Sequence, residues 1–187
     1  MSKKPIIIAE VKPQTPDGKI IGYWDDLFGI AKTVGDWISI HTNILWGGSF
    51  SLVSRARSLT EKPILAKGLH RTDDDVERAI DSGADYVLVV DRIPKVHEDK
   101  CLVEMSELQD LLGLPKHFKR VWNARDLRAL LAHRPPEVRV PIQDVRELCP
   151  DAWLCQASHI RSPWDIWPEV DAVIVGTHLR EFAHSLP

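Results

Sequence analysis

Several features that would narrow the function are scarce in this 187-residue sequence. Its three cysteines, Cys101, Cys149 and Cys155, are odd in number and lack a metal-binding spacing. We therefore expect reduced thiols rather than a disulfide framework or a zinc site. The eight histidines form no H-E-x-x-H pattern either, so the sequence predicts no metal.

The sequence also lacks long apolar segments and a large excess of positive or negative charge. No apolar run approaches the roughly 20 residues that cross a membrane, and residues 1–5 lack the apolar core of a signal peptide. The net charge of −3 gives no sign of a nucleic-acid partner. We expect a cytoplasmic protein with a small-molecule partner, and neither a membrane nor a nucleic-acid partner.

The composition that remains is that of a folded domain. Apolar residues make up 44% and charged residues 27%, which is typical of globular proteins. The length suits one domain with a proper core, and we expect residues 1–187 to form it. The chain is nevertheless short for a (βα)8 barrel, whose usual length is about 250 residues.

The most informative stretch is 6–12, where four apolar residues are followed by Glu10 and Lys12. An unbroken apolar run is typical of a strand that is covered on both faces of a parallel sheet. Glu10 and Lys12 are two positions apart and share one side of that strand. In a closed barrel, inward side chains near the carboxyl end of a strand reach the mouth where chemistry occurs. The two charges are either an ion pair or the start of an active site.

Further strand patterns alternate with helical patterns, which indicates βαβ units and a parallel sheet. The predicted strands are 6–12, 37–42, 63–67, 86–90, 101–105, 118–123, 152–156 and 172–176. The predicted helices are 23–33, 50–59, 73–82, 106–112, 142–148 and 163–167, with Thr72 and Ser106 as caps of the third and fourth. Eight strands fit, and the connection 91–100 is too short and too charged for a full helix.

A second register competes with this one. It makes 102–114 the fourth helix and 118–122 the fifth strand, which places Glu104 at a helix start. We prefer the first register because it brings polar residues to the ends of the strands. Even in that register, Asn123 and Arg125 are alternatively caps of the helix that follows, and Ser158 is alternatively a helix cap.

Motifs at the strand ends resemble, in order, those of the indole-3-glycerol phosphate synthases. Segments 9–12 and 15–18, Ala-Glu-Val-Lys and Thr-Pro-Asp-Gly, are similar to the family's A-E-x-K-x-x-S-P-S-x-G. Segment 63–67 resembles P-[VI]-L-x-K-D-F, although Gly68-Leu69 replaces Asp-Phe. Further matches are Trp46-Gly47-Gly48-Ser49, Leu102-Val103-Glu104, Asn123-Ala124-Arg125-Asp126-Leu127, Ser158-His159-Ile160-Arg161-Ser162-Pro163 and Val175-Gly176-Thr177.

The resemblance covers almost the whole chain and implies both fold and activity. It implies a minimal (βα)8 TIM barrel that lacks the family's N-terminal helical extension and the helix after the fourth strand. It also implies a carboxy-lyase of tryptophan biosynthesis that needs no cofactor. Such an enzyme closes the ring of 1-(2-carboxyphenylamino)-1-deoxyribulose 5-phosphate with loss of carbon dioxide and water, giving indole-3-glycerol phosphate.

Five catalytic roles follow from the same resemblance. Lys67 corresponds to the general acid and Glu104 to the general base. Lys12 would hold the carboxylate of the substrate, with Glu10 keeping that lysine charged and oriented. Asn123 would fix hydroxyl groups and developing charge.

The resemblance also implies five substrate-binding residues. Arg125, like Asn123, would fix hydroxyl groups and developing charge, and Thr15 belongs to the first loop motif. Ser158, Gly176 and Thr177 would supply donors to the phosphate at the usual barrel site after strands seven and eight.

Two departures leave alternatives open. Ala157 stands where the family has a glutamate, and His159 stands at a glycine of the phosphate loop, where it would either clash with phosphate or, when protonated, bind it. The alternatives are a non-catalytic barrel paralogue that binds a phosphorylated ligand or a partner, and a related sugar-phosphate enzyme with another substrate. A second copy of the chain or another enzyme of the tryptophan pathway is the expected protein partner.

Overall fold

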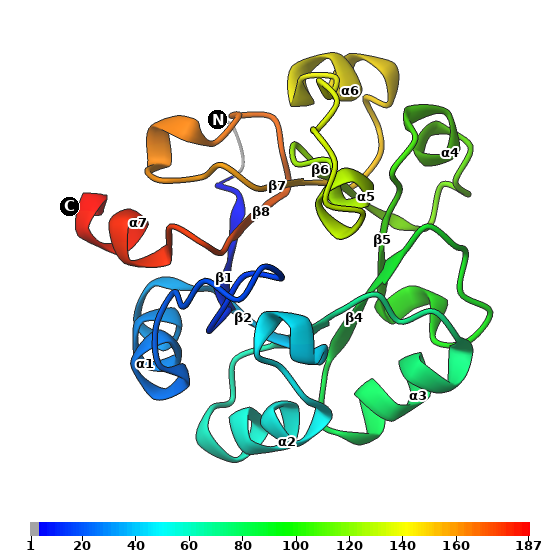
Figure 1. Cartoon of the computed structure of the whole chain (residues 1–187). Coiled ribbons are helices and arrows are strands. Elements are labelled where there is room, and N and C mark those ends of the chain that lie inside the picture. Colours follow the sequence, from blue (N-terminus) through cyan, green and yellow to red (C-terminus); the bar gives the residue numbers. More distant parts are fainter. Residues whose placement is uncertain (1–3) are drawn as a thin grey trace.

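A computed structural model describes residues 4–187, in which eight strands form a closed barrel in sequential order (Figure 1). Every neighbouring pair is parallel, and the last strand pairs with the first. The strands are β1 (Ile6–Val11), β2 (Trp37–His41), β3 (Ile64–Lys67), β4 (Tyr86–Val90), β5 (Cys101–Glu104), β6 (Lys119–Asn123), β7 (Leu154–Ala157) and β8 (Ala172–Val175). The predicted (βα)8 TIM barrel is confirmed.

Helices surround the barrel as an outer ring (Figure 1). They are α1 (Trp24–Val34), α2 (Phe50–Leu59), α3 (Asp73–Asp81), α4 (Leu108–Leu112), α5 (Leu127–Leu131), α6 (Ile142–Leu148) and α7 (Leu179–Ser185). The short 3-10 turns are η1 (Ile44–Trp46), η2 (Glu98–Lys100) and η3 (Pro163–Asp165). The sequence predicted neither α5 nor α7, whose Leu179 and Phe182 are buried. The predicted helix 163–167 is wrong: that segment forms only the 3-10 turn η3.

The connection from β4 to β5 holds only the turn η2, so the helix expected to be missing there is absent from the described chain. The competing register is therefore wrong: 102–114 is not one helix, and the segment after it forms the sixth strand. The β4–β5 pairing places Val90 beside Glu104, which fixes Glu104 at the carboxyl end of a strand.

Capping explains where several helices begin. Thr72 and Asp75 form a capping box at α3, as expected from the acidic first turn. Ser106 was wrongly predicted to cap α4: the N-cap is Glu107, and Ser106 instead donates from its backbone N–H and its hydroxyl to Asp91. At α5 the cap is Asp126, which accepts from the Ala129 N–H.

Alternation along the strands divides the apolar residues into two layers. Ile8, Leu65 and Leu88 belong to a cluster inside the barrel, whereas Ala9 and Ile38 pack in the cluster between the strands and the helices. Burial of each such aliphatic side chain contributes about 1.5–3 kcal/mol. A rigid apolar barrel therefore supports the polar residues at its carboxyl end.

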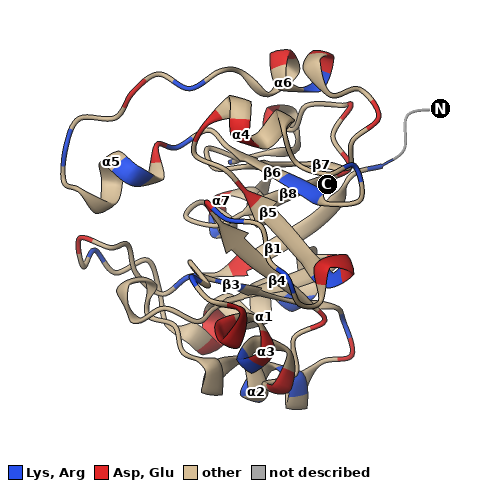
Figure 2. Cartoon of the chain, turned by 90° about the vertical axis from the view of Figure 1, so that its right-hand side faces the viewer, with Lys and Arg blue, Asp and Glu red and all other residues tan. Residues whose placement is uncertain are grey.

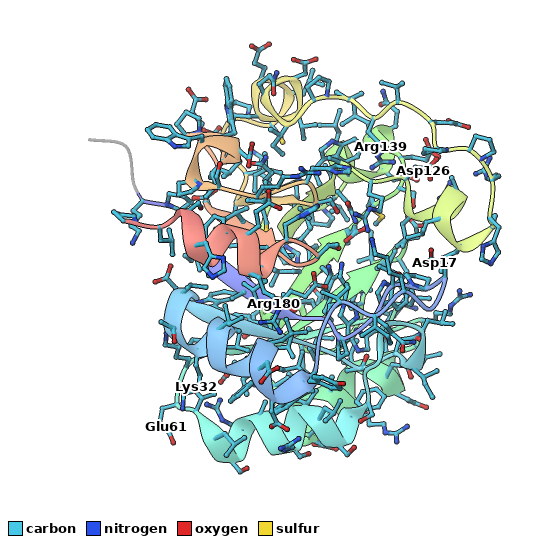
Figure 3. All side chains as sticks on the ribbon, turned by 60° about the vertical axis from the view of Figure 1, so that its left-hand side comes forward. Asp17, Lys32, Glu61, Asp126, Arg139 and Arg180 are labelled. Atoms are coloured by element: carbon cyan, nitrogen blue, oxygen red, sulfur yellow. The ribbon has the colours of Figure 1, made fainter. Side chains whose placement is uncertain are left out.

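Charges of both signs are interspersed over the outer helices and loops (Figure 2). Figure 3 separates the two ends of the barrel: Asp17 and Asp126 lie on the side of the carboxyl ends, and Lys32 and Glu61 lie on the opposite side. Among residues 4–187, no helix is long and apolar enough to cross a membrane.

Candidate active site

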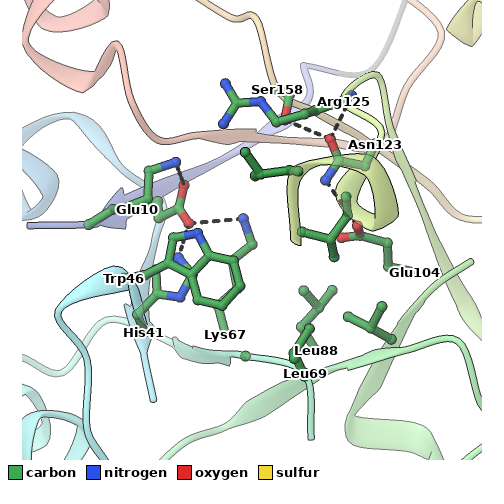
Figure 4. Close-up of a pocket in the computed structure, with 15 residues that line it drawn as sticks. Glu10, His41, Trp46, Lys67, Leu69, Leu88, Glu104, Asn123, Arg125 and Ser158 are labelled. Atoms are coloured by element: carbon green, nitrogen blue, oxygen red, sulfur yellow. Dashed lines mark hydrogen bonds and ion pairs between the residues drawn. The ribbon is translucent and has the colours of Figure 1, made fainter. Parts of the chain in front are cut away.

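The carboxyl ends of the strands surround a pocket that opens to solvent and spans about 460 Å³ (Figure 4). All five residues predicted to be catalytic line it, and so do Arg125 and Ser158. They come from different strands, β1, β3, β5 and β6, and from the segments that follow β1, β6 and β7. The parallel barrel brings them together because every strand ends at the same rim.

Glu10 is the centre of the first network in the pocket (Figure 4). Its Oε1 lies 2.9 Å from Lys67 Nζ and 2.5 Å from His41 Nε2, and its Oε2 lies 3.6 Å from Lys12 Nζ. The Glu10 side chain is only 2% exposed. Its carboxylate therefore joins three donors from β1, β2 and β3.

This network sets the charges of Glu10 and Lys67. Burial favours protonated Glu10, but the charges of Lys12 and Lys67 and the interaction with His41 outweigh it and hold the Glu10 pKa well below its usual value. Burial favours neutral Lys67, but Glu10 and Glu104 outweigh it and raise the Lys67 pKa. The pair is therefore a stable carboxylate and ammonium at neutral pH.

His41 is a member of this network that the sequence analysis missed. Burial lowers the pKa of His41 to about 4, so the ring is neutral and its Nε2–H donates to Glu10. Its Nδ1 has no partner among residues 4–187, and the ring stacks on Trp46 with the centroids 5.3 Å apart. Strand periodicity was the available signal, because His41 lies near the end of the predicted strand 37–42 on the same face as Ser39.

Glu104 belongs to a second network on the other side of the pocket (Figure 4). Its Oε1 accepts from Asn123 Nδ2 at 2.9 Å, and its Oε2 is buried without a partner among residues 4–187. Asn123 Oδ1 in turn accepts from the Ser158 hydroxyl at 2.6 Å and from the Arg125 N–H at 3.0 Å. Burial raises the pKa of Glu104, against the opposing charge of Lys67 and the amide of Asn123.

Arg139 positions this second network from a distant loop, which no local motif signalled. Its guanidinium donates to the backbone carbonyls of Met105, Ser106 and Asn123, and it lies 3.9 Å from the centre of the Trp122 ring. It thereby ties the end of β5 to the end of β6.

Lys12 lies between the catalytic pocket and a smaller cationic recess that it also lines. Burial lowers the pKa of Lys12 to about 8, with Lys67 and Arg125 adding to the decrease and Glu10 opposing it. Glu10 thus opposes the loss of charge on Lys12, which with a pKa of about 8 is mostly protonated at neutral pH.

The recess contains the residues predicted to bind phosphate. Ser158, Gly176 and Thr177 line it together with Arg125 and His159. The Thr177 hydroxyl is buried and has no hydrogen-bond partner within residues 4–187. A recess with several cationic side chains and an unsatisfied hydroxyl is suited to an anion.

Two residues of this recess have left-handed backbone conformations. Ser158 has φ of 73° and His159 has φ of 61°, and the left-handed region costs a residue with a side chain about 1–2 kcal/mol. Burial lowers the pKa of His159, and the nearby Arg125, His178 and Arg161 lower it further. At neutral pH the imidazole is therefore uncharged and adds no cation to the recess.

Gly176 has a role that the motif alone did not indicate. A Cβ at this position would collide with the carboxylate of Glu10 and lie 3.3 Å from Lys12 Nζ. The missing side chain therefore leaves room for the Glu10 network, in addition to any contact that the backbone makes with an anion.

Thr15 is the one predicted site residue that the structure does not bring to the pocket or the recess. It lies in the loop after β1, where its hydroxyl donates to Asp17 and its backbone N–H donates to Lys19 O at 2.9 Å. In the structure Thr15 stabilises its own loop, and a contact with substrate stays a prediction. Among the described residues no group of three or more metal-ligating side chains is found.

Comparison with known proteins gives two findings. No protein-family model matches the sequence. Over 135 residues, 70% of the chain, it is 29% identical to the indole-3-glycerol phosphate synthase of Sulfurisphaera tokodaii. The matched part spans about half of that relative, 52% of its length.

A crystal structure of KGPDC from Streptococcus mutans has the same fold, with a TM-score of 0.64 and 16% identity. The superposition covers 98% of this chain and 94% of that one. This likeness shows the fold alone. Together with the sequence match and the pocket, it supports a TIM-barrel enzyme.

The chemical capacity of the pocket follows from its two networks. Lys67 is an ammonium that can donate a proton, and Glu104 is a buried carboxylate whose raised pKa makes it a stronger base than an exposed carboxylate. The recess beside Lys12 can hold an anionic group of the same ligand. The site is therefore equipped for acid–base chemistry on a small anionic molecule.

Proposed function

We propose that the chain is a carboxy-lyase of the indole-3-glycerol phosphate synthase type, acting in tryptophan biosynthesis. The observation that carries the proposal is the pairing of a charged Lys67 with a Glu104 of raised pKa across one pocket. The 29% identity to an indole-3-glycerol phosphate synthase supports the same assignment.

Ring closure is the first step for which this pocket is suited. The substrate's ring carbon that bears the carboxylate forms a bond to the carbonyl carbon of the sugar, and the carbonyl oxygen takes up a proton. Lys67 would donate that proton, and Glu10 keeps it cationic. Carbon dioxide then leaves with cleavage of its bond to the ring, and the bonding electrons restore the aromatic ring.

Loss of water is the second step. Lys67, reprotonated from solvent after ring closure, would donate a proton to the hydroxyl group of the cyclic intermediate, which leaves as water. Glu104 would remove a proton from the neighbouring carbon of the intermediate and later return it to solvent. The raised pKa of Glu104 makes it a stronger base than an exposed carboxylate. Asn123 holds one carboxylate oxygen at 2.9 Å and leaves the other free of protein partners in the described chain.

The recess would hold the phosphate of the substrate. Arg125 supplies positive charge there, and the Thr177 hydroxyl lacks any other partner among residues 4–187. Lys12 lines both the recess and the pocket, so it would hold the carboxylate of the substrate and add positive charge near the phosphate. Gly176 permits close approach to the Glu10 network. Binding at this end would orient the carbonyl toward Lys67.

A second candidate is a sugar-phosphate barrel enzyme with a different substrate. Two observations favour it: Ala157 stands at the position of a family glutamate, and KGPDC shares the fold over almost the entire chain. This candidate would use the same recess and the same acid–base pair.

The test is fluorescence-monitored formation of indole-3-glycerol phosphate by the wild type, Lys67→Ala and Glu104→Gln. We expect turnover by the wild type and a loss of at least 100-fold in each variant, the usual contribution of a general acid or base. Binding without turnover in the folded wild type would favour a non-catalytic barrel. Absence of both binding and turnover would favour the second candidate.

A further inference from the structure

A second cavity opens beside the candidate active site, between the carboxyl ends of β3, β4, β5 and the helix α5. It shares Leu69, Val90 and Leu127 with the pocket of Lys67 and Glu104, so the two are adjacent. This outer chamber spans about 770 Å³ of space open to solvent, compared with about 460 Å³ for the pocket itself. A ligand that reaches Glu104 therefore has room to extend outward.

Leucines form an apolar wall along this space. Four of them are only partly buried and belong to none of the three apolar clusters found in residues 4–187: Leu69, Leu127, Leu130 and Leu131. Apolar side chains around a concave site are typical of ligand pockets. The wall is suited to a flat apolar group, such as the aromatic ring of the proposed substrate.

Arginines surround the outer end of the chamber, but most of them already have partners. Arg92 binds Asp73 at 2.6 Å, and Arg128 binds both Asp91 at 3.2 Å and Glu107 at 2.8 Å. Asp91 also accepts from Ser106, so this carboxylate is satisfied.

Arg71 differs from its neighbours at this rim. It is exposed, lines the chamber, and has no hydrogen bond or ion pair with any residue in the described range 4–187. Its guanidinium is available to bind a carboxylate by two parallel hydrogen bonds.

We propose that the outer chamber is a specificity subsite for an acidic substituent on the substrate's ring, with Arg71 as its counter-ion. This inference rests on the proposed function and specifies its substrate class. The phosphate would lie in the recess near Lys12, the ring against Leu69 and Leu127, and a second carboxylate near Arg71. The preferred substrates are then arylamino-deoxyribulose phosphates with an added acidic group.

The kinetic test compares the unsubstituted substrate with analogues that carry a further carboxylate at ring position 4 or 5, made from 2-aminoterephthalate or 4-aminoisophthalate. We expect the wild type to prefer at least one analogue by about tenfold in kcat/KM. Arg71→Gln should abolish that preference without changing the unsubstituted substrate, and Arg71→Glu should reverse it. Arg180→Gln, an exposed arginine on α7, is the matched control and should change neither.

A binding test separates this inference from the proposed function. Reduced analogues in which the sugar carbonyl is an alcohol cannot cyclise, and their binding is followed by tryptophan fluorescence. If neither the reduced monocarboxylate nor the reduced dicarboxylates bind, the proposed function is wrong, and the subsite with it. If the monocarboxylate binds and the dicarboxylates have no advantage, or keep one in Arg71→Gln, the subsite alone is wrong.

Discussion

Glu10 and Glu104 are two buried glutamates of one pocket with opposite surroundings. Both are almost inaccessible, at 2% and 3% exposure. Glu10 is surrounded by His41 and two lysines, and its pKa lies well below the usual value. Glu104 has one amide donor and one unpartnered oxygen among residues 4–187, and its pKa is raised.

The difference shows that the neighbouring groups, and not burial, determine the charge state and hence the role of each glutamate. Burial favours the protonated form of both carboxylates, and only the number of nearby cations and donors distinguishes them. A pair of like groups whose pKa values are pushed apart is a typical arrangement of an acid–base site. We therefore interpret Glu10 as a permanent anion that holds Lys67 in place, and Glu104 as the group that exchanges a proton.

The largest expected effect on stability comes from neutralising Glu10, with Glu104 as the comparison. Glu10→Gln leaves Lys67 and Lys12 buried without a carboxylate, so we expect a loss of about 3–5 kcal/mol in the free energy of unfolding. Glu104→Gln removes a charge whose burial is unfavourable, and we expect a change within about 1 kcal/mol. Urea denaturation measures the free energy of unfolding of both variants. Equal losses would show that the surroundings of Glu10 and Glu104 do not differ in the way described.

The sequence predicted Glu10 and Glu104 as site residues, but not that their pKa values shift in opposite directions. The two-residue period placed Glu10 and Lys12 on one side of β1, and the strand pattern placed Lys67 and Glu104 at strand ends. The opposite environments depend on pairing across strands distant in sequence. His41 reaches Glu10 from 31 residues away, and nothing near either residue indicates that contact.

Other features that the sequence did not predict depend either on contacts between distant segments or on local loop geometry. Thr15 matched a motif, but the loop after β1 turns its hydroxyl toward Asp17 instead of the pocket. The helix α7 is short, and its two buried residues, Leu179 and Phe182, leave too little periodicity to recognise. Arg139 reaches Asn123 from a loop without a motif.

Acid titration of stability tests the Glu10 network through His41. The ring has a pKa of about 4 in the folded state and about 6.5 when unfolded, so the unfolded chain binds more protons between these values. Stability should therefore fall as the pH drops through this window, by roughly 3 kcal/mol in total from this residue.

The control for this titration is His41→Gln, which keeps a donor toward Glu10 but cannot titrate. Between pH 6.5 and about 4.5 the variant should lose less stability than the wild type, measured as Tm against pH. Glu10 adds its own loss of stability toward pH 4.5, because its carboxyl binds protons in the unfolded chain before it does in the folded one, but this contribution is present in both proteins and cancels in the comparison. If Tm falls equally steeply with pH in the two proteins, the pKa of His41 is not lowered in the folded state.

A smaller effect is expected from filling the space that Gly176 leaves for Glu10. In Gly176→Ala the added Cβ would meet the Glu10 carboxylate, and overpacking of this kind costs about 1–3 kcal/mol. Gly29→Ala is the matched control, because its Cβ meets nothing within 4 Å and it lies inside α1. That variant should gain about 1 kcal/mol or less. Equal behaviour of both alanine variants would mean that Glu10 can move without penalty.

The smallest expected effect concerns the two lysines that share Glu10. Lys67 is 2.9 Å from the carboxylate and also feels Glu104, whereas Lys12 is 3.6 Å away and faces Arg125. Lys12, with a pKa of about 8, should lose its charge first, so KM for a phosphorylated substrate should rise several-fold from pH 8 to about 9. Lys12→Arg keeps its charge at these pH values and should give a flat KM profile. If KM still rises in Lys12→Arg, a group other than Lys12 titrates in this range. If kcat falls with the same pKa in the wild type, Lys12 takes part in the chemical step.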